Sequence, residues 1–312
     1  GRPLPFDAIE FDDRVATGDV LYDAGFLVMD LIDRGDRAGA ARFLDRFLVE
    51  SARLEAEARI RLGAPSGFAT RLSALLDGLD GLAALALFLS IRAGLRAKIA
   101  AARAVRLERA ERGTAEAEAR RLFAAALDHL EPVTPRLVAV GGLSGSGKSM
   151  LARALAPVLA PAPGAVVLRS DEIRKLLAGL VPTARLGPEH YTPEASARIY
   201  EVMEEATRRL LAAGRSVILD AASLRPAERT AVAHLAEAAE VPFTGLWLDV
   251  DAETALARVG DRRGDASDAD AEVVRFQLGL DLGRLDWHRL DANGSPEATL
   301  AAARARLGGT AA

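Results

Sequence analysis

The chain has 312 residues, and its 40 lysines and arginines against 44 aspartates and glutamates give a formal net charge of −4 at neutral pH. Half of the residues are hydrophobic, which is enough for buried cores and excludes a wholly disordered chain. The chain has no cysteine, so disulfides, thiolate zinc sites and a cysteine nucleophile are excluded.

The longest apolar run, residues 81–91, is shorter than the roughly 20 residues that a membrane span needs. The chain opens at Gly1 without a methionine or a signal peptide, and we interpret it as a piece of something longer. These features predict a cytoplasmic protein with no membrane partner. The acidic balance predicts no extended nucleic-acid partner, because such a partner requires a basic stripe on the protein.

The first part of the chain, residues 22–130, has apolar residues at helical spacing and no strand-like alternation. Within it, residues 93–121 are rich in Ala, Arg and Glu, and we interpret their charges as a solvated helix face. The pattern predicts an all-α region over residues 1–131.

Beyond the helical region, Pro132 and Pro135 punctuate the chain, and short β-branched runs begin to alternate with helical stretches. Helix N-caps are predicted at Thr192 and Ser295, each followed by a proline. Five short strands with crossover helices predict an α/β domain over residues 132–312, a three-layer, doubly wound parallel sheet. The predicted strands are residues 136–140, 165–169, 216–220, 244–250 and 286–291.

The strongest motif in the chain consists of Gly142, Leu143, Ser144, Gly145, Ser146, Gly147, Lys148 and Ser149. It fits the P-loop pattern G-x-x-x-x-G-K-[ST] and directly follows an apolar predicted strand. Glycines let successive backbone N–H groups turn toward a phosphate, and a lysine at this position supplies charge to the β- and γ-phosphates. We predict that these residues and Met150 bind ATP, with Lys148 also catalytic and Ser149 a Mg²⁺ ligand. The alternative is a glycine-rich turn without a ligand.

Two other predicted strands lead into carboxylates at the edge where ligands bind in open α/β sheets. Asp220 ends the third strand and is predicted to hold Mg²⁺ beside the P-loop, unless it simply caps a turn. Asp171 follows the second strand and is predicted to accept a proton from a substrate hydroxyl. Its alternative, compatible role is to cap a helix that begins at Glu172. Arg174, about one turn later, is predicted to bind an anionic group of the same substrate.

A charged stretch with few apolar residues follows the fourth predicted strand and its helix, and it is predicted to form a mobile lid. Arginines that close over the γ-phosphate neutralise charge during phosphoryl transfer. Arg258, Arg262 and Arg263 are therefore predicted to be catalytic, with the choice between Arg262 and Arg263 left open. Asp265 and Asp268 are predicted to hold these arginines or to shape the acceptor site. The alternative is a solvated surface loop.

Together these motifs resemble the P-loop kinases that include gluconate kinase-like, polynucleotide 5′-kinase-like and zeta-toxin-like enzymes. The resemblance is carried by the P-loop, residues 169–175, residues 216–220 and the charged stretch, and it covers about residues 137–307. It implies a P-loop NTPase fold in which Asp171 is the general base and Arg174 holds a phosphate or carboxylate of the acceptor.

Residues 5–11 and 19–31 resemble the stretch just after the catalytic loop of aminoglycoside phosphotransferase-like proteins. In bacteria that domain is found fused ahead of a P-loop kinase-like, AAA-family ATP-binding domain. The resemblance implies that Asp7 matches the metal-binding aspartate and Asp23 the structural one. The catalytic loop and nucleotide-binding lobe of the family would lie upstream, so residues 1–131 are interpreted as a C-terminal remnant without an activity of its own.

The leading prediction is thus an ATP- and Mg²⁺-dependent kinase that phosphorylates a hydroxyl of a small molecule or nucleotide. Two alternatives stay open: a nucleotide-binding regulatory or ATPase module, and a zeta-toxin-like kinase of a nucleotide-sugar. Asp171 and Arg174 discriminate the kinase from the regulator, because a switch needs the P-loop and Asp220 but no acceptor base. The helical region is interpreted as a scaffold, with acceptor recognition as the alternative. Whether the chain forms a homo-oligomer is left open.

Overall fold

The computed structural model describes residues 18–261 and 264–308. Their contacts divide the chain into two compact units. The first unit holds the described residues up to 30 together with 84–130, and the second unit holds 31–83 and the described residues from 131 onward. The predicted domain boundary at residue 131 stays a prediction.

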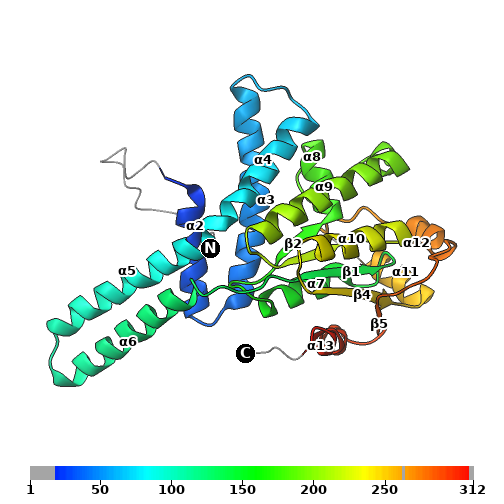
Figure 1. Ribbon diagram of the computed structural model, residues 1–312. Helices are drawn as coiled ribbons and strands as arrows, with labels where there is room; N and C mark the ends of the chain where they lie inside the picture. Colours follow the sequence, from blue (N-terminus) through cyan, green and yellow to red (C-terminus); the bar gives the residue numbers. More distant parts are fainter. Residues whose placement is uncertain (1–17, 262–263, 309–312) are drawn as a thin grey trace. The chain divides into compact units, whose positions relative to one another are not determined.

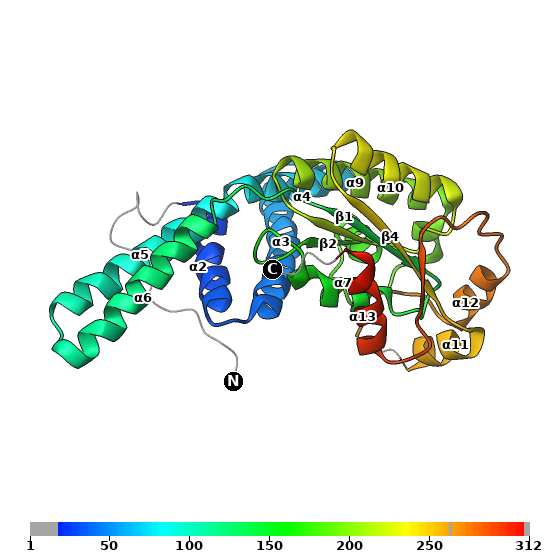
Figure 2. The same cartoon turned by 60° about the horizontal axis from the view of Figure 1, so that its bottom comes forward.

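The described residues of the first unit are helical, as the sequence predicts. Most of α2 (Val20–Asp33) belongs to it, with α5 (Leu85–Val105) and α6 (Arg109–Asp128). α5 and α6 pack along each other as a helical hairpin (Figure 2). Asp30 accepts hydrogen bonds from Arg92 and Arg96 at 3.3–3.4 Å, which ties α2 to α5.

The second unit is built on a five-stranded sheet with the order β2-β3-β1-β4-β5 (Figure 1). All neighbouring strands are parallel, and this confirms the predicted fold class. The strands are β1 (Leu137–Gly142), β2 (Val166–Arg169), β3 (Val217–Asp220), β4 (Phe243–Asp249) and β5 (His288–Asp291).

Helices cover both faces of the sheet and complete the three predicted layers. α9 (Pro193–Ala212) and α10 (Pro226–Ala238) lie on one face, and α7 (Lys148–Leu155) and α13 (Pro296–Arg306) lie on the other (Figures 1 and 2). One core cluster joins buried residues of β1 and β4 to α7 and α13. Thr192 and Ser295 cap α9 and α13 through their hydroxyls, as predicted.

The remaining elements of this α/β part follow the ends of the strands. The helices are α8 (Ser170–Ala178), α11 (Ala252–Gly260) and α12 (Ala271–Leu278), and the short 3-10 turns are η2 (Ala156–Val158) and η3 (Pro188–Tyr191). α8 begins directly after β2, so its first turn lies at the carboxyl edge of the sheet.

Two helices from the N-terminal part of the chain pack within the second unit. α3 (Arg37–Arg61) contacts β2, and α4 (Phe68–Asp80) contacts α8 and α9. β2 is an edge strand, and its Val167 N–H donates to the Asp45 carboxylate of α3 at 3.3 Å. This side-chain acceptor satisfies an N–H that an edge strand would otherwise present to another chain.

One stretch, Phe68–Val105, is long and apolar enough to cross a membrane by length and composition alone. It comprises α4, the 3-10 turn η1 (Gly81–Ala84) and α5. Core helices of water-soluble proteins pass the same test, so a single stretch is weak evidence for a membrane segment. Both helices bury leucines within the structure, such as Leu79 of α4 and Leu89 of α5, which accounts for part of this apolar content.

Candidate active site

The P-loop joins β1 to α7 and is shaped by its glycines. Gly142, Gly145 and Gly147 have φ values of +140°, +85° and +94°, which side chains rarely tolerate. A Cβ at Gly145 would lie 2.4 Å from the carbonyl oxygen of Ala255 in α11. The Ser146 hydroxyl is buried and has no hydrogen-bond partner among the described residues. The loop is therefore a tight backbone cradle at a helix N-terminus, the arrangement that binds phosphate.

Side chains hold the P-loop from two directions. Lys148 folds back over it, and its Nζ donates to the carbonyl oxygens of Gly142 at 2.9 Å and Leu143 at 2.8 Å. On the other side, the Ser144 N–H donates to Gln277 Oε1 of α12 at 2.8 Å. The lysine charge thus lies within the loop that the sequence predicts to bind ATP.

Arg169, the last residue of β2, is the centre of a buried charge cluster. Its guanidinium pairs with three carboxylates: Nε with Asp220 at 3.0 Å, Nη1 with Glu172 at 3.0 Å and Nη2 with Asp265 at 2.8 Å. Burial alone would lower the pKa of Arg169, but the three negative charges raise it above its usual range. The Arg169 and Asp220 side chains are each 4% exposed, so the centre of the cluster is shielded from water.

Asp220 lies where the sequence predicts, at the carboxyl end of β3 and in register with Val140 two residues before the P-loop. Its buried carboxylate pairs with Arg169 instead of capping a turn. The described residues contain no group of three or more His, Asp or Glu side chains that could hold a metal. The Mg²⁺ site at Ser149 and Asp220 therefore stays a prediction.

Asp171 lies in the first turn of α8. The N-cap position of that helix is Arg169, so the alternative in which Asp171 caps a helix beginning at Glu172 is wrong. Burial raises the pKa of Asp171; the charge of Asp220 adds to this effect, while Arg169, a hydrogen bond with the Ser267 side chain, and Lys148 oppose it. The charges of Lys148 and Asp220 act on Asp171, so these three predicted site residues share one electrostatic environment.

Arg174 is also buried, on the same helix. Its guanidinium donates to the His190 carbonyl and, at 3.5 Å, to the Ser196 hydroxyl, and it lies 4.7 Å from the centre of the Tyr191 ring. Burial lowers the pKa of Arg174, and the charge of Asp171 opposes that effect. The buried Nε has no hydrogen-bond partner in the part of the chain that the structure describes. Nη1 and Nη2 of Arg174 thus each donate a hydrogen bond inside the protein, whereas Nε has its donor left for an anion.

The predicted lid is described in part. Arg258 of α11 donates to the Ala292 carbonyl at 2.8 Å and to the two following carbonyls at 3.4 Å, which ties α11 to the segment after β5. Arg262 and Arg263 lie outside the described residues. The catalytic roles of these three arginines stay predictions.

Several site residues were not predicted from the sequence. The sequence motifs assign no role to Arg169, Lys175, Tyr191 or Gln277. Lys175 is four residues after Asp171, and this helical spacing is a signal that could have placed both on one face of α8. The partners of the others lie far away in the chain, where local spacing carries no information.

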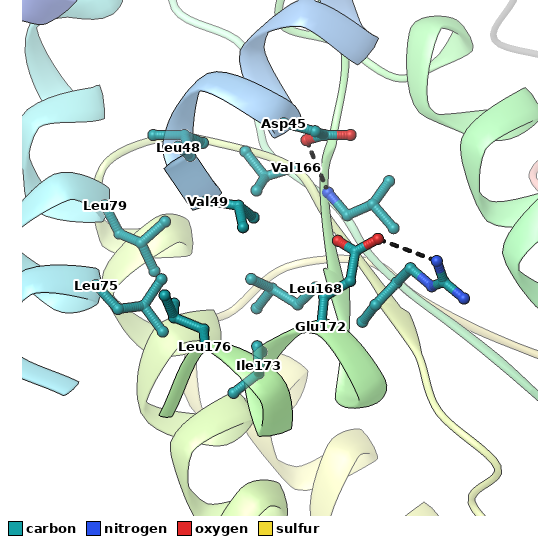
Figure 3. Close-up of a pocket in the computed structure, with 12 residues that line it drawn as sticks. Asp45, Leu48, Val49, Leu75, Leu79, Val166, Leu168, Glu172, Ile173 and Leu176 are labelled. Atoms are coloured by element: carbon teal, nitrogen blue, oxygen red, sulfur yellow. Dashed lines mark hydrogen bonds and ion pairs between the residues drawn. The ribbon is translucent and has the colours of Figure 1, made fainter. Parts of the chain in front are cut away.

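A small cavity lies between α3, α4, β2 and α8, as Figure 3 shows. Its volume of about 30 Å³ leaves room for about one or two water molecules, so it is no ligand site. Asp45 and Glu172 line it, and Glu172 also accepts a hydrogen bond from Arg169 of the charge cluster. Burial and the charge of Glu172 raise the pKa of Asp45 to about 8. The hydrogen bond from Val167 and the charge of Arg153 act in the opposite direction but are weaker.

The sheet order and the P-loop together define an α/β P-loop kinase fold, preceded by helices. Residues 137–279 match the family described as an AAA domain.

Uncharacterized proteins of Mycobacterium tuberculosis and Mycobacterium bovis are 30% identical to this chain over 304 residues, 95% of the chain and 54% of each relative. The chain thus spans about half the length of the curated relatives it matches. An adenylyl-sulfate kinase of Myxococcus xanthus is 34% identical over 117 residues, which are 38% of this chain and 59% of that protein.

Two solved structures of other bacterial proteins are also similar. A sugar kinase from Janibacter is 24% identical, with a TM-score of 0.42 over 55% of this chain and 94% of that one. A gluconokinase from Sinorhizobium meliloti is 21% identical, with a TM-score of 0.40 over 56% of this chain and 92% of that one.

Proposed function

We propose that the α/β part of the second unit is an ATP- and Mg²⁺-dependent kinase that transfers the γ-phosphoryl group to a hydroxyl of a small molecule or nucleotide. One observation carries the proposal: Asp171 lies in the electrostatic field of both Lys148 and Asp220 at the carboxyl edge of the sheet. A phosphate cradle needs no such base, whereas transfer to a hydroxyl gains from one. The 34% identity to an adenylyl-sulfate kinase supports the same class.

Each residue has a distinct role in this proposal. The P-loop amides and Lys148 hold the triphosphate. Mg²⁺, held by Ser149 and Asp220 when bound, would neutralise charge on the β- and γ-phosphates. The oxygen donors and the glycine cradle fit this nucleotide complex. Arg169 keeps the Asp220 carboxylate in one place.

On the acceptor side, Asp171 takes the proton of the attacking hydroxyl, and its raised pKa makes it a stronger base than an ordinary aspartate. Arg174 uses its Nε donor to orient the acceptor. Arg258, with Arg262 or Arg263, neutralises the charge of the transferred group.

A coupled ATP-turnover screen tests the proposal. The purified chain is offered sugars, sugar acids, aminoglycosides, nucleosides and oligonucleotide 5′ ends, with Lys148→Ala as the blank. We expect one class to raise ATP turnover, and Asp171→Asn to reduce that turnover by about 10²- to 10⁴-fold while ATP still binds. If Asp171→Asn leaves the turnover intact, the chain is a regulatory or ATPase module instead. Absence of ATP binding in the presence of Mg²⁺ would contradict the proposal as a whole.

For the helical region, we propose the C-terminal part of an aminoglycoside phosphotransferase-like domain, in a cytoplasmic protein. The length of the mycobacterial relatives supports a further domain in this family of chains. The coding sequence upstream is the direct test, and it should contain a His-Gly-Asp…Asn loop. An upstream sequence without that loop would contradict the assignment.

A further inference from the structure

Three hydrogen-bond donors converge on the carboxylate of Asp268. Lys175 Nζ of α8 lies 3.0 Å from Oδ1, the Tyr191 hydroxyl of η3 lies 2.6 Å from Oδ2, and the Leu186 N–H lies 3.2 Å from Oδ2. The Lys175 side chain is 0% exposed and that of Asp268 is 11% exposed. A carboxylate with donors on both oxygens, a buried ammonium among them, is bound as a ligand would be.

The environment of Asp268 stabilises negative charge. Burial alone would raise its pKa, but the hydrogen bonds from Tyr191, Lys175 and Leu186 lower it below its usual range. The donors come from α8, η3 and the segment before η3, whereas Asp268 comes from the segment between α11 and α12. An oxyanion of another molecule would meet the same donors if that segment moved aside.

The residue before Asp268 contacts the predicted base. Against the effect of burial, the Ser267 side chain lowers the pKa of Asp171, so a hydroxyl of the chain lies near the predicted base. Ser267 and Asp268 thus present a hydroxyl to Asp171 and, one residue further, a carboxylate to Lys175. This pair has the chemistry of a small hydroxylated acid.

We propose that Lys175, Tyr191 and the Leu186 N–H form an oxyanion subsite for the acceptor, and that Ser267 and Asp268 occupy the acceptor's place when it is absent. The inference rests on the proposed kinase function and names its substrate class: a hydroxyl compound with a carboxylate or phosphate a few bonds away. Arg174 lies over the Tyr191 ring and borders the same subsite.

Displacement of Asp268 sets the affinity that an acceptor can reach. A carboxylate tethered in the same chain competes at a high effective concentration. The acceptor therefore gains only the difference between its own contacts and those of Ser267 and Asp268. Removal of the Asp268 carboxylate should open the subsite to small anions that cannot compete with it.

Anion binding tests the subsite directly. The probes are inorganic phosphate and glycolate, the latter carrying a hydroxyl and a carboxylate, and calorimetry gives their dissociation constants. All variants carry Lys148→Ala, so that phosphate binding at the P-loop is weakened. We expect Asp268→Ala to bind at least one probe about tenfold more tightly than the chain with Asp268 intact. A gain with phosphate alone assigns a phosphate to the acceptor, and a gain with glycolate alone assigns a carboxylate.

Two further variants separate a subsite from a loosened segment. Adding Lys175→Met to Asp268→Ala should abolish the gain, because the ammonium is the main attraction. Asp270→Ala, which removes the N-cap of α12 from the same segment, should bring no gain. Equal affinities in the chains with and without Asp268 would overturn the proposal, as would a gain that survives Lys175→Met.

A milder variant keeps the test valid if Asp268→Ala does not fold. Asp268→Asn removes the charge and retains the shape, and it should bind the same probe more tightly, by a smaller factor. The folded state of each variant is checked by its unfolding transition. These measurements record anion binding and need no ATP turnover. The subsite can therefore be disproved by the binding data even if the acceptor screen succeeds, and supported by them even if the screen finds no acceptor.

Discussion

The P-loop and the Arg169 cluster lie at the same edge of the sheet but are built in different ways. The P-loop is a continuous run of eight residues whose shape comes from glycine backbone and two side-chain contacts. The cluster gathers Arg169, Glu172, Asp220 and Asp265 from three separate segments, and it holds them by charge. The loop that we propose binds phosphate is thus shaped by local backbone, whereas the cluster depends on charges that lie far apart in the sequence.

The largest expected effect comes from removing the cation at the centre of the cluster. Arg169→Met leaves three carboxylates, the buried Asp220 among them, without their shared partner. We expect the free energy of unfolding to fall by about 3–5 kcal/mol, measured by urea denaturation. Arg289→Met is the matched control, because its pair with Asp249 is exposed and should contribute about 0–1 kcal/mol. Similar losses in both variants would show that the buried cluster stabilises the fold no more than an exposed ion pair does.

The converse variant acts on the P-loop and spares the fold. Lys148→Ala removes the charge that lies over the loop, and we expect ATP turnover to fall by about 10²- to 10³-fold. The unfolding transition should move little, since Lys148 is only partly buried. Met150→Ala is the control for the loss of side-chain atoms beside the loop, because Met150 is 58% exposed and its side chain carries no charge. A large loss of stability in Lys148→Ala would mean that this lysine stabilises the fold, as Arg169 is expected to do.

The same contrast explains what the sequence could predict. The P-loop, the five strands and the caps at Thr192 and Ser295 are local patterns, and the structure has the strands within two residues of their predicted bounds. The pairs Arg169–Asp265 and Lys175–Asp268 join residues 96 and 93 positions apart, so no spacing rule reveals them. Only the fold brings these charges together. The packing of α3 on β2 is equally non-local.

Stability measured as a function of pH tests the protonation of Asp45, which lies near Glu172 of the cluster. Asp45 has a pKa raised to about 8, from 3.8, by burial and by the charge of Glu172. Between these values the folded chain keeps a proton that the unfolded chain loses. The free energy of unfolding should therefore fall by about 1.4 kcal/mol per pH unit as the pH rises from about 4 to about 8.

The variants for this series separate the proton from the packing. Asp45→Asn stays neutral and should remove that slope from the urea midpoints recorded at pH 5, 6, 7 and 8. Leu48→Ala, at the same cavity, should lower stability by about 2–5 kcal/mol at every pH and leave the slope unchanged. An unchanged slope in Asp45→Asn would mean that Asp45 is ionised in the folded chain.

The smallest expected effect lies beside the P-loop, at Gln277 of α12. Its Oε1 accepts from the Ser144 N–H of the P-loop, so Gln277→Ala should lower the free energy of unfolding by about 1 kcal/mol. Gln277→Glu keeps the acceptor and adds a negative charge beside the phosphate cradle. It should keep the stability but weaken ATP binding by about two- to fivefold, less at high salt. If both variants weaken ATP binding equally and independently of salt, Gln277 acts by shaping the loop. The glycine backbone alone would then not be enough to hold the loop in its binding shape.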